Sequence, residues 1–219
     1  MSLPIGVINL STVVSNDDVA KVAVAVQKQI FDHASIIWPI RNVRMEMADK
    51  NWKGWTIAVL DNSDQADALG YHELTKLGMP VSFVFAKTCI DDKVSWSVCF
   101  SHESLEMMVD PYINATADVG DAKFYAYEVC DPVEDDSFGY EIDGVLVSDF
   151  VTPEWFIEGA AGPYSFKQHV SAPLTLAKGG YCSYFDPKSG KWSQQTDFSK
   201  VSARAVPTRY SRRGRRFGL

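Results

Sequence analysis

The chain has 219 residues, of which 46% are hydrophobic and 22% are charged, and these proportions exclude a largely disordered protein. The formal net charge is −7 although six arginines lie between 204 and 216, so an acidic body carries a basic tail. The most apolar early segment, 19–26, is too short and too polar to span a bilayer, so we expect no membrane contact.

The first part of the chain has strand and helix patterns in turn. Residues 4–10 are β-branched and apolar, which is typical of a strand. Ser15 can cap a helix, and apolar residues then recur at helical spacing to about Ala34. Residues 42–47 and 56–60 indicate two further strands, the second buried on both faces.

The next segments end in the helix that carries the chemistry. Residues 61–78 are polar and contain two glycines, which predicts a loop. Residues 81–87 predict a strand of the edge or antiparallel kind, followed by a short polar loop. Residues 96–109 have the apolar spacing of a helix, which Pro111 closes. The order is therefore strand, helix, strand, strand, strand, helix.

Hairpin patterns dominate the second half. An Asp143–Gly144 turn separates two alternating runs within 140–150. A second hairpin is predicted over 180–195, with its turn at 186–190.

Together these patterns predict an α+β fold, in which a mixed sheet with two main helices precedes a hairpin-rich C-terminal region. We expect a single domain over 1–203, with an α/β part at 1–137 and a hairpin-rich part at 138–203. Residues 204–219 form the basic tail.

The predicted helix 96–109 carries a histidine and two glutamates at informative spacing. His102 and Glu106 are four residues apart, so they project from nearly the same angle, as two ligands of one ion must. Glu103 has the position of the catalytic glutamate in the metalloprotease motif H-E-x-x-H, so it is the candidate proton acceptor. The alternative is an amphipathic surface helix with a His102–Glu106 ion pair.

A catalytic ion needs about three protein ligands and a water, so a third ligand must come from elsewhere. Glu128 is the first choice, because Asp131 follows it and can accept the ring N–H of His102. Weaker candidates for the third ligand are Asp110, His72 and Tyr112.

Residues about 4 to 131 resemble the zincin fold, a mixed sheet whose active helix carries the zinc motif and follows an edge strand. Glu128 with Asp131 is similar to the gluzincin branch, in which a second helix supplies a glutamate ligand and a nearby aspartate. A family of uncharacterised zincin-like proteins of bacteria and tailed bacteriophages resembles the stretches ALGYHELTKLGMPVSFVFAK, SHESLEMMVDPYIN and YEVCDPVEDDSFGYEIDGVLVSDF.

This resemblance implies a metal-dependent hydrolase that acts on a peptide or protein, with zinc held by His102, Glu106 and Glu128. Glu106 stands where the motif has its second histidine, so the ligand set carries two negative charges and also suits other divalent ions, such as manganese or calcium. The alternative function is a structural or assembly protein of a bacteriophage virion, on a zincin-like scaffold without turnover.

Partners and location are indicated by the two ends of the chain. The tail residues Arg212, Arg213, Arg215 and Arg216 predict contact with nucleic acid or an acidic partner, and further copies of the chain or other virion proteins are also expected partners. The start lacks the pattern of a secretory signal, and the four cysteines lack CxxC spacing. We therefore expect reduced thiols and a cytoplasmic protein, or one in a virion assembled in the host cytoplasm.

Overall fold

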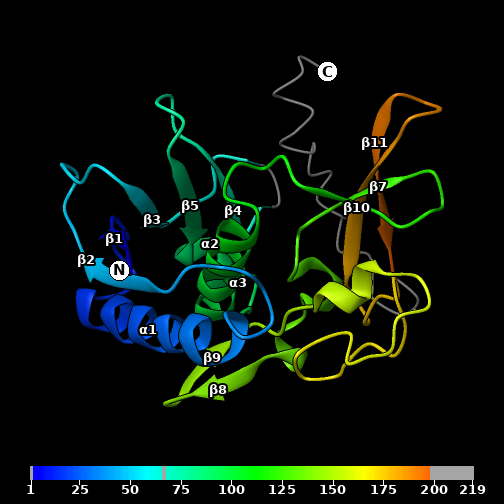
Figure 1. Cartoon of the computed structure of the whole chain (residues 1–219). Helices are drawn as coiled ribbons and strands as arrows, with labels where there is room; N and C mark the ends of the chain where they lie inside the picture. Colours follow the sequence, from blue (N-terminus) through cyan, green and yellow to red (C-terminus); the bar gives the residue numbers. More distant parts are fainter. Residues whose placement is uncertain (1, 66–67, 198–219) are drawn as a thin grey trace.

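The computed structural model describes residues 2–65 and 68–197, and its first half is built on a five-stranded mixed sheet (Figure 1). The strand order across this sheet is β2 (Val43–Met47), β1 (Leu3–Asn9), β3 (Trp55–Leu60), β5 (Pro80–Phe85) and β4 (Gly70–Leu74). Strands β2, β1, β3 and β5 are parallel, whereas β4 runs antiparallel to β5 and forms one edge. The buried runs of β1 and β3 supply apolar residues to the core, as the sequence predicts.

Helix α1 (Asn16–Gln29) begins at a capping box that the sequence makes recognisable. The Ser15 hydroxyl accepts from the backbone N–H of Asp18 at 3.1 Å, and the Asp18 carboxylate accepts from the backbone N–H of Ser15 at 3.1 Å. A π-helical turn, η1 (Ile30–Ala34), continues the helix, so the predicted end near residue 34 is confirmed.

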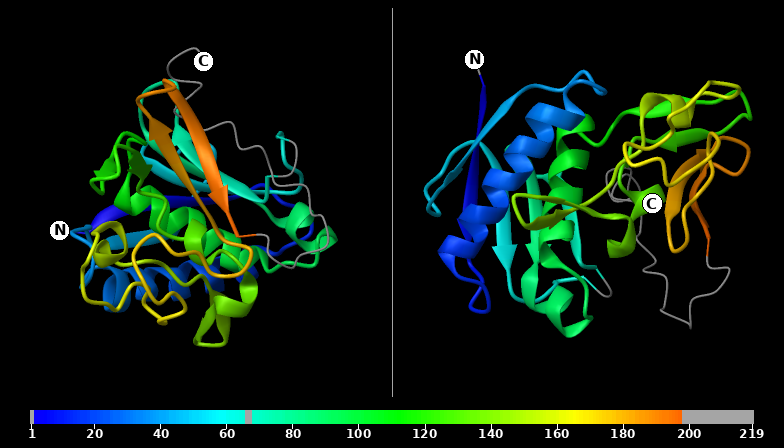
Figure 2. Two further views of the ribbon diagram at one scale, coloured as in Figure 1. Left: turned by 90° about the vertical axis from the view of Figure 1, so that its right-hand side faces the viewer. Right: turned by 90° about the horizontal axis from the view of Figure 1, so that it is seen from below.

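Two helices form a layer against the sheet. Helix α1 packs on β1 and β2, and α3 (Trp96–Val109) packs on β4 and β5. The two helices also contact each other and lie side by side (Figure 2). A short helix, α2 (Ala86–Asp91), joins β5 to the segment before α3.

The C-terminal region adds an antiparallel sheet in the order β11 (Lys191–Thr196), β10 (Tyr181–Asp186), β7 (Phe124–Ala126) and β6 (Thr116–Asp118). A separate hairpin of β8 (Tyr140–Ile142) and β9 (Val145–Val147) packs against α1 and α3 through β9. Short 3₁₀ turns lie at η2 (Asp131–Val133), η3 (Asp136–Phe138) and η4 (Pro153–Phe156).

One hydrophobic core runs through both regions. It includes Ile5 and Val59 of the sheet, Phe100 of α3, and Phe150 and Trp155 of the C-terminal region. The α+β class, with two main helices and two C-terminal hairpins, is confirmed. The domain boundaries at 137 and 203 stay predictions, and the basic tail lies outside the described residues.

Two local predictions are wrong and a third is correct in part. Residues 70–74 form strand β4 where the sequence predicts a loop. Residues 86–91 form α2 in place of a polar loop. Of the edge or antiparallel character predicted for 81–87, the antiparallel pairing is present, since β5 runs antiparallel to β4, whereas β5 lies inside the sheet and not at its edge. His72 of β4 is buried where the strand packs on α3, and this contact has no signature in the local sequence.

Candidate metal centre

Helix α3 is enclosed on all sides at the residues that carry the motif. Residues 100–108 are all buried, and His102, Glu103 and Glu106 have exposed fractions of 4%, 1% and 1%. The alternative of an amphipathic surface helix is therefore excluded. Because a buried charge is costly without compensation, these side chains must find their partners inside the protein.

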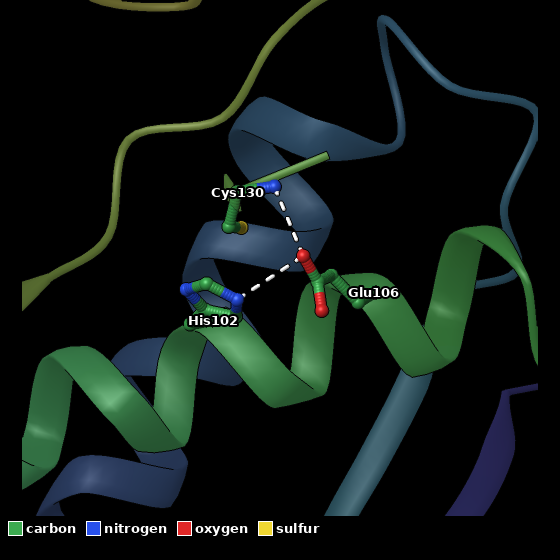
Figure 3. Close-up of side chains that lie close together, drawn as sticks. All are labelled: His102, Glu106 and Cys130. Carbon is green, nitrogen blue, oxygen red and sulfur yellow. Dashed lines mark hydrogen bonds and ion pairs between the residues drawn. The ribbon is translucent and has the colours of Figure 1, made fainter. Parts of the chain in front are cut away.

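One group of contacts joins α3 to the segment that follows β7. We call His102, Glu106, Cys130 and Asp131 the loop side of the cluster. Nε2 of His102 lies 3.1 Å from Oε1 of Glu106 and 3.1 Å from Oδ1 of Asp131. The backbone N–H of Cys130 donates to the same Glu106 oxygen at 3.3 Å (Figure 3). The distances around His102 are those of hydrogen bonds.

The predicted contact between Asp131 and His102 is present, but its geometry differs from the expected one. Asp131 and Glu106 both face Nε2 of the ring. An aspartate that orients a metal-bound histidine accepts from the ring nitrogen that the metal does not use. Asp131 therefore lies at the same ring nitrogen as Glu106 and not at the nitrogen where an orienting aspartate would lie.

The electrostatics of the loop side favour a proton on His102. Burial lowers the pKa of the ring, but the charge of Glu106 and the hydrogen bond to Asp131 outweigh burial and raise the pKa well above its ordinary value. Burial also raises the pKa of Glu106, so the His102–Glu106 pair holds a proton in the ion-free protein. Burial, together with the charge of Glu106, also raises the pKa of the Cys130 thiol, so the sulfur is neutral unless a cation binds it.

A second group of contacts joins α3 to the edge strand β4. We call His72, Glu103, Glu106 and Glu128 the β4 side of the cluster. Nδ1 of His72 lies 3.6 Å from Oε2 of Glu103 and 3.7 Å from Oε2 of Glu106. Nε2 of the same ring lies 3.9 Å from Oε2 of Glu128. These separations are too long for direct hydrogen bonds.

The β4 side fits a metal ion better than it fits a hydrogen-bond network. Two ligand atoms that are each about 2.1 Å from an ion at the tetrahedral angle are about 3.4 Å apart. One ligand atom from each of His72, Glu103 and Glu106 lies within 4.8 Å of the other two. His102, Glu106 and Cys130 satisfy the same condition on the loop side, so Glu106 belongs to both donor sets.

A glycine permits the close approach of α3 to β4. A Cβ atom at Gly70 would lie 2.6 Å from Sγ of Cys99, 2.8 Å from Cγ of Glu103 and 2.9 Å from the carbonyl oxygen of Phe83. Any larger residue would therefore push the helix and the strand apart. Gly70 lies two residues before His72, so it helps to set the distance between His72 and Glu103.

The remaining predicted residues lie in several places. Glu128 is in an irregular segment before η2, so the second helix implied by the gluzincin resemblance is absent at this residue. Its carboxylate is close to His72. The side chain of Asp110 accepts from the backbone N–H groups of Asn114 and Ala115, which is a structural use. Tyr112 is 49% exposed and thus at the surface. The four tail arginines lie outside the described residues.

Two members of the cluster received little weight from the sequence. His72 is only a weaker candidate because its segment is predicted to be a loop, and Cys130 is set aside because the cysteines lack metal-ligand spacing. The signal for Cys130 is its place between Glu128 and Asp131, since these two acids contact His72 and His102 of the cluster.

No protein-family model, no curated protein and no solved structure matches the chain. The resemblance to zincins therefore remains an expectation, and the argument for function comes from the site. Within residues 2–65 and 68–197, none of the helices has the length and apolar character needed to cross a bilayer.

Proposed function

We propose that this protein is a metal-dependent hydrolase of the zincin type, whose ion is held on the β4 side by His72, Glu103 and Glu106. The observation that carries the proposal is the convergence of two α3 carboxylates on Nδ1 of one buried histidine, at the spacing of metal ligands. Glu128 lies at the other nitrogen of the same ring. A histidine nitrogen and carboxylate oxygens suit zinc, and they also suit manganese.

The charge of the cluster supports a divalent ion. Two histidines contribute at most two positive charges, whereas four carboxylates lie around them: Glu103, Glu106, Glu128 and Asp131. With all four acids ionised, an excess of two negative charges remains even when both rings are protonated, and burial opposes this excess by raising the pKa of Glu106. Because uncompensated buried charge is costly, a divalent cation is the natural counterion for this excess.

The chain supplies the groups that hydrolysis needs. A bound divalent ion supplies Lewis acidity, which polarises a carbonyl and lowers the pKa of a water molecule. Glu128 has 17% of its side chain exposed and is the most accessible carboxylate of the cluster, so we assign it the role of proton acceptor. Glu103, the acceptor suggested by the sequence, faces His72 and is assigned as a ligand. His102 positions Glu106 by their 3.1 Å contact.

A second candidate function is a structural or assembly protein, such as a virion component, that uses the ion for folding. The observation in its favour is the burial of the ligands, because His72 and Glu103 each have only 1% of their surface exposed. Closed sites are typical of structural ions, whereas catalytic ions keep an open position. The peptide substrate of the first candidate depends on the resemblance to zincins alone.

Metal analysis of the purified protein, together with hydrolysis of an unfolded protein substrate, tests the proposal. We expect bound zinc or manganese in the unmodified protein, loss of that metal in His72→Ala, and retained metal without turnover in Glu128→Gln. His169→Ala is the matched control, because His169 contacts Asp149 outside the cluster. Unchanged metal content in His72→Ala would refute the assigned site. Bound metal with no hydrolysis of any peptide in a library would favour the structural role.

A further inference from the structure

The carboxylate of Glu106 presents its two oxygens to two different donor sets. Oε2 faces Nδ1 of His72 at 3.7 Å on the β4 side. Oε1 faces Nε2 of His102 at 3.1 Å on the loop side. A carboxylate in this position is the usual bridge between two metal ions that lie about 3.5–4 Å apart.

We propose that the loop side binds a second divalent ion, held by His102, Glu106 and Cys130, and that Glu106 bridges the two ions. One ligand atom of each residue lies within 4.8 Å of the others. Figure 3 shows the three side chains gathered above one turn of α3. The loop-side ion is additional to the β4-side ion, and only the β4-side ion rests on the proposed function.

The donor types of the loop side indicate which ion it selects. Thiolate and imidazole ligands favour zinc and similar borderline-soft ions over magnesium or calcium. A thiol that binds a metal ion does so as the thiolate and releases its proton to solvent, so the buried Cys130 can serve as a ligand only when an ion is bound. Asp131, which lies 3.1 Å from Nε2 of His102, is a further oxygen donor at the same place.

Titration of the metal-free full chain with cobalt(II) tests the inference. We expect two equivalents to bind, with a near-ultraviolet thiolate-to-cobalt charge-transfer band that belongs to the loop-side ion. Cys130→Ser should abolish the band and lower the stoichiometry to one, whereas His72→Ala should keep the band and lose the other ion. Cys182→Ser is the control, because Cys182 is also buried but lies in β10.

Manganese(II) binding to the unmodified protein gives a test that needs no variant. Two ions bridged by one carboxylate are expected to show exchange coupling by electron paramagnetic resonance, whereas a lone ion gives the hyperfine pattern of isolated manganese. In the cobalt titration, binding of a single equivalent without a thiolate-to-cobalt band would contradict the second ion and leave the hydrolase proposal intact. Two equivalents that both survive His72→Ala would instead contradict the first site.

Discussion

The loop side and the β4 side share the carboxylate of Glu106 but differ in their distances. On the loop side, His102 contacts its acidic partners at 3.1 Å, which is a hydrogen-bond distance. On the β4 side, His72 is 3.6–3.9 Å from its acidic partners. A proton in the His102–Glu106 pair offsets the negative charge of the loop side without an ion. On the β4 side, the atoms around Nδ1 of His72 have the spacing of ligands around a metal ion.

This difference has an energetic consequence. The loop side has contacts of hydrogen-bond length around His102, and these are present without an ion. The β4 side gains most from a cation, because an ion between its carboxylates offsets their mutual repulsion. The two histidines should therefore respond differently to the same substitution.

The largest expected effect comes from replacing each histidine with glutamine in the presence of a chelator. His102→Gln removes the positive charge between Glu106 and Asp131, and we expect it to lower the free energy of unfolding by about 3–5 kcal/mol. His72→Gln nearly conserves volume, and the carboxylates nearest to the ring are 3.6–3.9 Å away, so its cost should stay below about 1.5 kcal/mol. Urea unfolding of both variants measures the difference. Equal losses in the two variants would show that the sides are equivalent.

Metal removal should have the next largest effect and should act through the β4 side. At a free-ion concentration about 100 times the dissociation constant, binding stabilises the folded state by about 2.7 kcal/mol. For a chain of this size, that is a rise in melting temperature of about 5–10 °C relative to the chelated protein. Calorimetry with and without EDTA measures the shift. We expect His72→Ala to remove the part of the shift that the β4-side ion supplies, and a shift that is unchanged in this variant would place that ion elsewhere.

Gly70→Ala should affect the β4 side through a steric clash between β4 and α3. Its new Cβ would lie under 3.0 Å from atoms of Cys99, Glu103 and Phe83, so we expect a stability loss of about 1–3 kcal/mol. Because α3 and β4 must move apart, metal affinity should fall at least about tenfold. Gly6→Ala is the control, since its Cβ would lie 2.6 Å from Trp52, outside the cluster. It should destabilise the fold without changing metal affinity. A loss of affinity in both variants would indicate general unfolding.

Elements that depend on local sequence signals could be predicted, whereas elements that depend on tertiary contacts could not. Local signals were sufficient for α1, because Ser15 and Asp18 form its cap, and for the hairpin at Asp143–Gly144. Strand β4 could not be predicted, because His72 is a poor strand signal until α3 covers it. Its antiparallel pairing with β5 is likewise a tertiary feature.

The part of the site that follows from the geometry of α3 could be predicted from the sequence. His102 and Glu106 meet because residues four apart share a face of α3, and Asp131 lies beside them as expected. The approach of His72 to Glu103 depends on the packing of a strand against a helix, and spacing along the chain does not encode it. For this reason the sequence pairs Glu128 with His102, whereas in the structure the Glu128 carboxylate faces His72.

The smallest expected effect concerns Asp61, a partly buried acid outside the cluster whose carboxylate is stabilised by hydrogen bonds. Its carboxylate accepts from the hydroxyls of Ser11 and Thr12, each at 2.6 Å, and from the backbone N–H of Thr12 at 2.8 Å. The hydrogen bonds from the Ser11 and Thr12 side chains are the main causes that lower the pKa of Asp61 from 3.8 to about 2.

Because the folded pKa of Asp61 lies below its unfolded value, its stabilisation is present above the unfolded pKa and is lost as the pH falls through about 2. We expect Asp61→Asn to remove this part of the acid sensitivity and to leave metal content unchanged. A carbon NMR titration of the Asp61 carboxylate, with acid unfolding of both proteins, measures the effect. An ordinary pKa at Asp61 would mean that hydroxyl donors do not compensate a carboxylate here.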